Sequence, residues 1–542
     1  MLSYPFMEHF DVLIIGAGLS GIGAAARLRM DCPGMSFAIL EGREAMGGTW
    51  DLFRYPGVRS DSDMFTLGYR FKPWSDAKAI ADAPAILKYI RETASEYDLE
   101  KDISYGHRVK RAEWSSETSQ WTVEVRVSGP SVSSPHVSKG SFDEEATNQD
   151  GIGVADQAET RAVASVPHRV EDLPQSREDA KQETVQFTCS FLYLCTGYYD
   201  YEKGYTPDWP GFEEYSGTIV HPQKWPKDFD YAGKKVLVIG SGATAVTLVP
   251  AMAETAEHVT MLQRSPTYVV TLPSEDKIAN FLRAILPAKA AYALTRWKNV
   301  LRQMFFYELS RKRPSVMKRL IAKGVRNEVG DEIAEKHFKP NYNPWDQRLC
   351  VVPDSDLFKS IRDGRASMIT GLINKFTETG LELSDGEIID ADIIVTATGL
   401  VLKIMAGLEL VVDSETVDLS KVMAYKGMMY SDVPNLAQAF GYTNASWTLK
   451  CDLTAEYVCR LLKYMDHHGY ASCVPRATDP SVKPEPVLDF NSGYVLRALH
   501  TLPSQGSKTP WRLHQNYVKD LSMLRYGRVD DGTMEFRCGA NK

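Results

Sequence analysis

The chain has 542 residues, of which 44% are hydrophobic and 24% charged, and its formal net charge is −8 at pH 7. This composition is typical of an ordinary globular protein. The length exceeds what one hydrophobic core organises, so about three folding units are expected. The acidic balance of charge excludes a protein that coats nucleic acid, and no nucleic-acid partner is expected.

Targeting and metal signals are weak along the chain. No apolar run approaches the roughly 18 residues that span a bilayer, and residues 1–10 lack the basic and apolar regions of a secretory signal. The eight cysteines are scattered, which favours a reducing, cytoplasmic setting over a disulfide scaffold. No Cys/His spacing typical of zinc sites is present, so no metal site is expected.

A βαβ unit opens the chain. The apolar run Asp11–Ile15 predicts a buried parallel strand, residues 22–29 predict a helix, and Phe37–Leu40 predicts the second strand. The turn after the first strand carries three glycines at the spacing of a dinucleotide-binding motif: Gly16, Gly18 and Gly21.

The chemistry of a pyrophosphate explains this glycine spacing. A pyrophosphate needs backbone N–H donors at close range, and a helix N-terminus offers them where glycine lets the backbone approach. Glu41, at the end of the second strand, is suited to accept hydrogen bonds from a ribose diol. Strand, glycines, helix, strand and acid together predict a dinucleotide site.

The same pattern recurs near the middle of the chain. Strands are predicted at Lys235–Ile239 and His258–Leu262, with a helix over residues 246–256. The turn has alanine in place of the third glycine, and its predicted cofactor-binding residues are Gly240, Gly242 and Thr244. The second strand ends not in an acid but in Arg264, whose guanidinium suits the 2′-phosphate of NADPH; a plain surface charge is the alternative.

Two dinucleotide sites on one chain indicate electron transfer between two cofactors. NADPH donates hydride, so its partner is expected to be a flavin, and FAD is the flavin with a pyrophosphate for the first site. A reduced flavin passes electrons to a disulfide, a quinone or oxygen. No cysteine pair lies near the first motif, so elimination favours oxygen.

The fold class expected is α/β, with two Rossmann-like dinucleotide-binding domains and a helical subdomain inserted in the NADPH domain. Strand-like runs at Phe191–Cys195 and Ile393–Ala397 both end in Thr-Gly, which indicates a discontinuous first domain; Thr398 and Gly399 are expected near the cofactor. The predicted parts are 9–127, first part of the FAD domain; 128–183, low-complexity insertion; 184–225, second part of the FAD domain and linker; 226–379, NADPH domain with helical insert 275–345; 380–500, last part of the FAD domain; and 501–542, C-terminal tail.

The stretch 277–323 holds twelve basic residues and one acidic residue, with apolar residues interleaved. One interpretation is a helical cap over the second domain with a solvated basic face. The other is a peripheral contact with anionic lipid that gathers apolar substrate.

The segment Tyr215–Pro226, YSGTIVHPQKWP, resembles the FxGxxxHxxxW fingerprint of Baeyer–Villiger monooxygenases, except that Tyr215 replaces phenylalanine. Its matching residues are Gly217, His221 and Trp225. The resemblance implies that the histidine lies in the hinge between domains; a general base is the alternative.

Residues 47–64, GGTWDLFRYPGVRSDSDM, resemble a second stretch of the same family and are most similar to its ethionamide-activating and putative long-chain alkane-oxidising subgroup. The resemblance implies that this stretch helps bind the cofactor through Gly48, Thr49, Trp50 and Asp61. Its coverage is nearly the whole chain, apart from residues 128–183 and the last forty or so.

The resemblance also implies the reaction. NADPH reduces tightly bound FAD, O2 adds to form a C4a-peroxyflavin, and a ketone becomes an ester or lactone, with sulfoxidation of thioethers as a side activity. The active-site arginine of the family falls at Arg348, and Asp61 is the aspartate that holds it. A structural salt bridge and a helix cap are the alternatives for these two residues, and Gln347 stands where relatives often have a basic residue.

Other classes stay open at this point. A sister group of flavin monooxygenases oxygenates nitrogen or sulfur, and a redox sensor that binds flavin without catalysis is a third hypothesis. The physiological substrate and the oligomeric state are not predicted.

Overall fold

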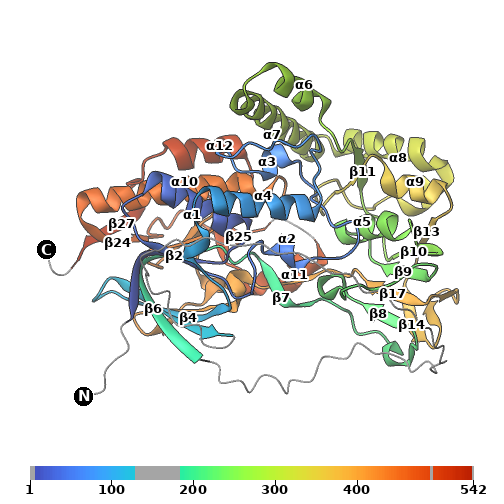
Figure 1. The fold of residues 1–542 in the computed structure, drawn as a ribbon, viewed down its shortest axis with the longest axis horizontal. Coiled ribbons are helices and arrows are strands. Elements are labelled where there is room, and N and C mark those ends of the chain that lie inside the picture. The colour runs from blue at the N-terminus through green and yellow to red at the C-terminus, as the bar shows by residue number, and fades with distance from the viewer. Residues whose placement is uncertain (1–6, 129–182, 489–491, 540–542) are drawn as a thin grey trace, which may run out of the picture.

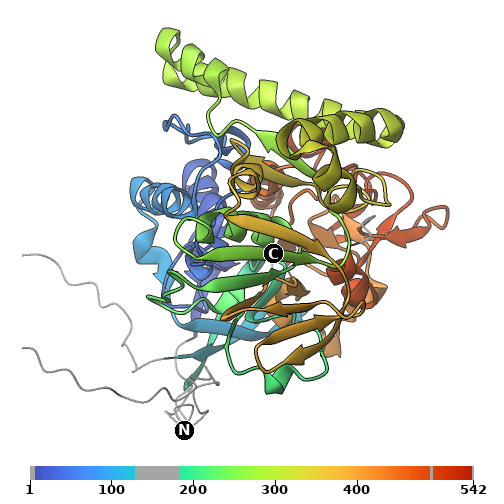
Figure 2. The same cartoon turned by 90° about the vertical axis from the view of Figure 1, so that its right-hand side faces the viewer.

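The computed structural model describes residues 7–128, 183–488 and 492–539, and its strands form two large sheets with helices packed on them (Figures 1 and 2). The predicted low-complexity insertion, residues 128–183, lies outside the described residues except at its two ends. The predicted fold class, α/β with two Rossmann-like domains, is confirmed by the two sheets described below.

The first sheet has nine strands and forms the FAD domain expected from the first glycine motif. In order across the sheet they are β20 (Glu415–Thr416), β19 (Glu409–Val412), β4 (His107–Ser115), β5 (Gln120–Val127), β6 (Glu183–Leu194), β1 (Glu8–Ile15), β2 (Phe37–Leu40) and β3 (Ile103–Ser104), with β23 (Leu436–Gln438) also paired to β6. The strands from β6 to β3 are parallel, whereas β4, β5 and β6 form an antiparallel meander.

Strand β1 shows why this sequence makes a central strand. Val12 and Ile14 enter one hydrophobic cluster, while Leu13 and Ile15 enter another on the opposite face. Because strand side chains alternate between faces, a continuous apolar run is stable only where both faces are covered. The helices α1 (Leu19–Asp31), α4 (Ala83–Glu96) and α10 (Trp447–His468) contribute to the first of these clusters.

The second sheet has five strands, all parallel. They are β13 (Ala366–Thr370), β10 (His258–Gln263), β9 (Lys235–Ile239), β17 (Ile393–Thr396) and β8 (Thr218–Val220). The apolar run of β9 also contributes to two hydrophobic clusters, because Val236 and Val238 pack in one cluster and Leu237 and Ile239 pack in another. Helices α5 (Ala243–Met252), α8 (Pro314–His337) and α9 (Asp356–Arg362) supply residues to the first of these two clusters.

Two predicted domain boundaries are wrong. The FAD domain was expected to resume at residue 380, but β17 pairs with β9 and β8 in the second sheet. The strands just before it, β15 (Gly380–Leu383) and β16 (Ile388–Asp390), belong to a separate three-stranded sheet. Likewise β8 belongs to the second sheet, although residues 184–225 were expected in the first domain and linker. Parallel pairing joins distant segments, so local pattern does not reveal which sheet an apolar strand completes.

The predicted helical insert is present as α6 (Lys277–Ile285), α7 (Ala288–Lys312) and α8. It does not cap one domain alone. Helix α8 packs in the core of the second domain, whereas α7 contacts α3 (Met64–Leu67) and contributes Tyr292 and Val300 to the core of the first. In Figure 1 these helices lie along the top edge of the molecule, above both sheets.

The expectation of a tail over residues 501–542 is wrong for the described part of that segment. Trp511, Tyr517 and Leu524 are buried in the core of the first domain, and β27 (Met534–Cys538) pairs with β24 (Tyr470–Pro475). Burial of large apolar side chains stabilises this segment as part of the fold. Among the described residues, none of the helices has the length and apolar character needed to cross a membrane.

Candidate functional site

One cavity of about 820 Å³ touches both glycine motifs. This volume is at the upper end of the range usual for ligand pockets. Twelve of the predicted site residues line it: Gly18, Gly48, Thr49, Trp50, Asp61, Gly240, Gly242, Thr244, Arg264, Arg348, Thr398 and Gly399. Six predicted residues are not in its lining: Gly16, Gly21, Glu41, Gly217, His221 and Trp225.

The three glycines of the first motif have separate steric roles. Gly16 has φ +106°, a conformation that side chains disfavour, and a Cβ on Gly21 would lie 1.8 Å from the carbonyl oxygen of Gly16. Gly18 differs, because a Cβ there would make only ordinary contacts, with Gly48, and the residue lines the cavity. Gly16 and Gly21 therefore shape the turn, and Gly18 leaves room for a ligand.

The second motif repeats this division of roles. Gly240 has φ +144°, while a Cβ on Gly242 would meet nothing within 4 Å. Ala245, in the place of the third glycine, is buried against the sheet. Gly18 and Gly242 are the N-cap residues of α1 and α5, and neither cap has a side chain bonded to the first amides. Both motifs thus combine free helix N-termini with open space, which fits a pyrophosphate.

Glu41 lies at the end of β2, as predicted, but its carboxylate is turned toward the backbone. Its two oxygens accept hydrogen bonds from the amides of Ala17 (2.7 Å) and Arg43 (3.0 Å). Burial raises the pKa of Glu41 above its usual value. A carboxylate has further lone-pair sites, so contact with a ribose stays a prediction.

The segment around Gly48 extends the floor of the cavity. Gly48 has φ +54° and lies against Gly18. Thr49 begins the short helix α2 (Thr49–Leu52), and its hydroxyl is 2.7 Å from the hydroxyl of Tyr199. A second glycine, Gly57, with φ +75°, is close to Thr247 and Ala251 of α5. This segment therefore runs from the first glycine motif to the NADPH domain.

Arg348 and Asp61 meet at the cavity. Nη2 of Arg348 is 2.8 Å from Oδ2 of Asp61, and the two side chains are 40% and 30% exposed. Asp61 comes from the first domain, and Arg348 lies just before β12 (Cys350–Pro353) in the second. A further ion pair, between Arg59 and Asp356, joins the same two parts of the chain. The ion pair is what the family resemblance implies.

The electrostatics around this pair keep the guanidinium charged. The negative charge of Asp61 raises the pKa of Arg348 further above its already high usual value. Burial raises the pKa of Tyr494 to about 12 and that of Cys350 to about 12. Near neutral pH the cavity therefore presents a permanent cation beside neutral hydroxyl and thiol groups.

Arg264 is exposed at the cavity edge, just past the end of β10. Within the described residues it has no hydrogen bond or ion pair. An unpaired guanidinium beside the second glycine motif is available for an anionic ligand. The position agrees with a role in binding a 2′-phosphate, which stays a prediction.

Thr398 and Gly399 lie where the chain returns from the second sheet to the first. The hydroxyl of Thr398 donates to the carbonyl of Tyr205 at 2.6 Å, and a Cβ on Gly399 (φ +114°) would meet nothing within 4 Å. The two crossing segments, β7 (Tyr199–Gly204) and β18 (Leu400–Leu402), pair with each other. The two segments in which the chain passes between the domains therefore lie side by side at the cavity.

The fingerprint residues lie outside the cavity lining. The ring of His221 is packed against Gly204 of β7, its Nδ1 accepts a hydrogen bond from the amide of Gln223 (3.2 Å), and burial lowers its pKa. Trp225 packs edge-on against Phe229 with ring centroids 5.6 Å apart. The position of His221 directly after β8, with its ring against β7, agrees with a hinge role better than with a general base at the cavity.

Several residues that line the cavity were not predicted from the sequence. Tyr198, Tyr199 and Tyr201 follow the Thr-Gly at the end of β6, and that position was a usable signal for them. Tyr494 and Arg497, on α11 (Gly493–Ala498), had no local motif. No group of three or more His, Cys, Asp or Glu side chains suited to a metal occurs in the described part of the chain.

Comparison with known proteins identifies the family. Residues 174–467 match the flavin-binding monooxygenase-like family, and residues 14–77 match an NAD(P)-binding Rossmann-like domain. The FAD-containing monooxygenase EthA of Mycobacterium tuberculosis H37Rv is 47% identical over 531 residues, which cover 98% of each chain. The chain belongs to the flavin-binding monooxygenase family.

Two further comparisons agree. The probable FAD-binding monooxygenase AlmA of Acinetobacter baylyi is 44% identical over 98% of this flavin monooxygenase and 96% of its own chain. A steroid monooxygenase structure bound to NADP shares the fold, with a TM-score of 0.71, 21% identity, and coverage of 98% and 100%. The predictions of the family and of a flavin-dependent oxygenating enzyme are confirmed. The similarity covers 98% of the chain, more than the sequence motifs predicted.

Proposed function

We propose that this flavin monooxygenase uses FAD, NADPH and O2 to convert ketones into esters or lactones, with sulfoxidation of thioethers as a second activity. In the balanced reaction, ketone, O2, NADPH and a proton give ester, NADP⁺ and water. Bound FAD, once reduced by NADPH, supplies the activation of dioxygen. The chain supplies binding, orientation and fixed charge.

The binding roles follow from the two glycine motifs. The amides at the start of α1, next to Gly18, would bind the pyrophosphate of FAD, and Gly48, Thr49 and Trp50 line the cavity beside them. The amides at the start of α5, next to Gly242, would bind the pyrophosphate of NADPH, with Arg264 at the edge of the cavity. Both motifs line one cavity, so the two cofactors would share it.

The observation that carries the proposal is the ion pair of Arg348 and Asp61 on the wall of this shared cavity. A guanidinium offers positive charge and donors without acting as an acid, so it stabilises an oxyanion that develops on the substrate carbonyl. Asp61 fixes the orientation of the guanidinium. Insertion next to a ketone carbonyl needs such stabilisation.

A product assay tests the proposal. The holoenzyme with NADPH and ¹⁸O2 is offered a cyclic ketone, an aliphatic ketone, a thioether and a tertiary amine in separate reactions. The expected result is an ester or lactone carrying one ¹⁸O atom. Formation of sulfoxide or N-oxide with no ester from either ketone would overturn the Baeyer–Villiger proposal and favour the N- or S-oxygenating alternative.

The departure from the fingerprint at Tyr215 gives that alternative little support. The Tyr215 ring is buried and its hydroxyl donates to the carbonyl of Ala391 at 2.7 Å. Tyrosine thus takes the place of phenylalanine with its extra polar group satisfied. Tyr215 does not line the cavity; it lies in the hydrophobic cluster that contains Phe376.

A further inference from the structure

Helices α6 and α7 expose an unusual amount of apolar surface. Of the sixteen large hydrophobic side chains that are exposed in the described chain, eight lie on these two helices. Phe281 and Phe305 are each 63% exposed. The eight are Ile278, Phe281, Ile285, Leu294, Trp297, Leu301, Phe305 and Phe306. A gathering of this kind marks an interaction surface rather than scattered surface residues.

The spacing aligns these side chains in stripes. On α6, Ile278, Phe281 and Ile285 recur at intervals of three and four residues. On α7 the same intervals separate the large side chains from Leu294 to Phe305. Residues so spaced share one helix face. On both helices that face is turned to solvent.

Polar side chains on the inner face of α7 hold it in this orientation. Buried Arg296 donates to the carbonyl oxygens of Phe65 and Gly68, both at 2.8 Å. Asn299 donates to Asp63 at 2.9 Å. The inner face of α7 therefore carries buried polar side chains beside the apolar Tyr292 and Val300, while large apolar side chains on its outer face meet solvent.

Basic residues surround the exposed apolar side chains. Lys277, Lys289 and Arg302 are exposed on the same two helices, and residues 277–323 hold twelve basic residues and one acidic residue. Apolar side chains framed by cations are typical of surfaces that lie in the headgroup region of an anionic bilayer. We propose that α6 and α7 dock this enzyme on the surface of a membrane rich in anionic phospholipid.

The charge argues against a second copy of the chain as the occupant of this face. In a symmetric dimer the same patch meets itself, so the cations of the two copies would face one another. A bilayer surface instead brings anionic headgroups to the cations and acyl chains to the apolar stripes. Figures 1 and 2 both place these yellow-green helices along the top edge of the molecule.

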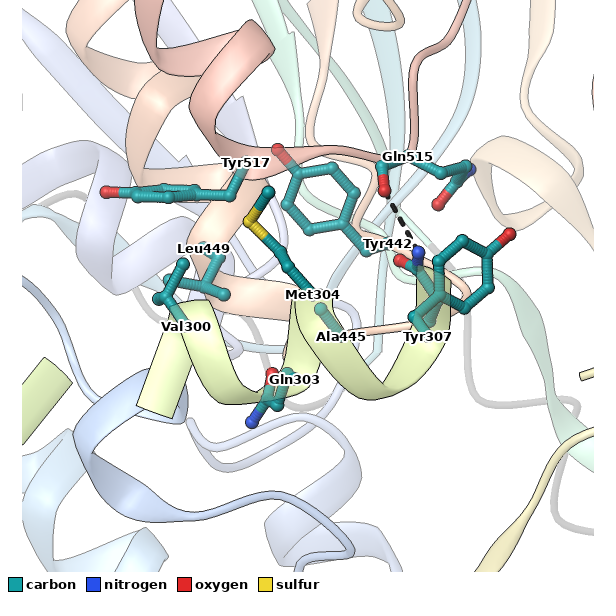
Figure 3. A pocket seen from close by; sticks show the side chains of 10 residues that line it. Val300, Gln303, Met304, Tyr307, Tyr442, Ala445, Leu449, Gln515 and Tyr517 are labelled. Atoms are coloured by element: carbon teal, nitrogen blue, oxygen red, sulfur yellow. Dashed lines mark hydrogen bonds between the residues drawn. The ribbon is translucent and has the colours of Figure 1, made fainter. Parts of the chain in front are cut away.

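The inner side of α7 leads toward the reaction cavity. Val300, Met304 and Tyr307 line a small cavity of about 10 Å³, and Met304 points toward Tyr442 and Tyr517 (Figure 3). Tyr442, like Ala445, also lines the large cavity. One helix thus separates the proposed lipid surface from the neighbourhood of the site, which suits substrates that dissolve in lipid.

Vesicle flotation tests the docking surface without turnover, so its outcome is independent of the proposed reaction. FAD-loaded protein is mixed with phosphatidylcholine vesicles or with vesicles that also contain phosphatidylglycerol. The expected result is binding that requires phosphatidylglycerol and weakens in high salt, because salt screens the cations. Phe281→Ser should weaken binding about tenfold. Lys277→Gln combined with Lys289→Gln should weaken it about fivefold for each charge.

Matched controls lie outside α6 and α7, with Ile388 on the second domain and Lys421 on the first. Ile388 is 62% exposed and Lys421 has a side chain 81% exposed, so Ile388→Ser and Lys421→Gln alter similar surface away from α6 and α7 and should leave binding unchanged. Circular dichroism and flavin content check that each variant is folded. Absence of binding to anionic vesicles, or equal loss in the controls, would overturn the proposal. So would a wild-type dimer in light scattering that Phe281→Ser converts to a monomer.

Discussion

Replacing Arg348 with alanine should separate cofactor oxidation from oxygen transfer. The variant keeps both glycine motifs, so FAD content and NADPH oxidation should persist. It loses the donors that face the substrate oxygen, which typically costs about 100–1,000-fold in rate, or about 2.7–4 kcal/mol of transition-state stabilisation. Reducing equivalents should then appear as hydrogen peroxide.

The partner residue should give a smaller effect of the same kind. Two unit charges about 4 Å apart interact by about 4 kcal/mol at an effective dielectric constant near 20. The side chains of Arg348 and Asp61 are 40% and 30% exposed, so solvent screening reduces the value to about 1 kcal/mol. Asp61→Asn should therefore lower ester formation about fivefold.

The assay measures three quantities in the same reaction: NADPH consumed, peroxide released and ester formed. Arg54→Ala is the matched control, since Arg54 is 68% exposed and does not line the cavity. Ester formation by Arg348→Ala at the rate of the unmodified enzyme would refute the reasoning. So would loss of flavin from this variant, because the residue would then be structural.

Three further predictions concern other parts of the fold. Arg264→Ala should lower kcat/KM for NADPH about 10–100-fold, the value of one charge-assisted hydrogen bond, and leave NADH unchanged; equal effects in steady-state kinetics would contradict the assignment. Gly18→Ala should lower the flavin content with little change in Tm. Gly21→Ala should instead lower Tm, because a Cβ at position 21 would lie 1.8 Å from the carbonyl oxygen of Gly16. The reverse pattern in flavin absorbance and thermal melts would refute these roles. Burial lowers the pKa of His221 in the folded protein, so below about pH 6.5 the unfolded state binds an extra proton and the stability of the fold decreases. His221→Gln should therefore reduce the drop in Tm between about pH 7.5 and pH 5.5. An identical drop in the variant and the unmodified enzyme would argue against a buried neutral histidine.

Short-range features were predictable from the sequence. Strand β9 has the predicted bounds, Lys235–Ile239, because an apolar run followed by glycine has few other stable conformations. The two glycine motifs were equally clear, since the positive φ angles of Gly16 and Gly240 belong to a single turn. Arg264 could be predicted as a cofactor-binding residue because it lies at the end of a predicted strand.

The composition of the site depended on longer-range information. The meeting of Arg348 with Asp61 was implied by resemblance to a family and not by any local pattern, because the two residues lie on different domains. Tyr494 and Arg497 reach the cavity wall from a segment that carries no motif. Side chains of this kind are brought to a site by the packing of whole domains.

The sequence by itself therefore determined three features: two dinucleotide sites, a flavin reduced by NADPH, and a helical stretch rich in basic and apolar residues. Only the tertiary structure decided that β8 and β17 complete the second sheet, that described residues after 501 belong to the first core, and that a stripe of large apolar side chains on α7 faces outward. Glycine sterics and strand alternation act over a few residues, whereas sheet membership and burial depend on contacts between segments far apart in the chain.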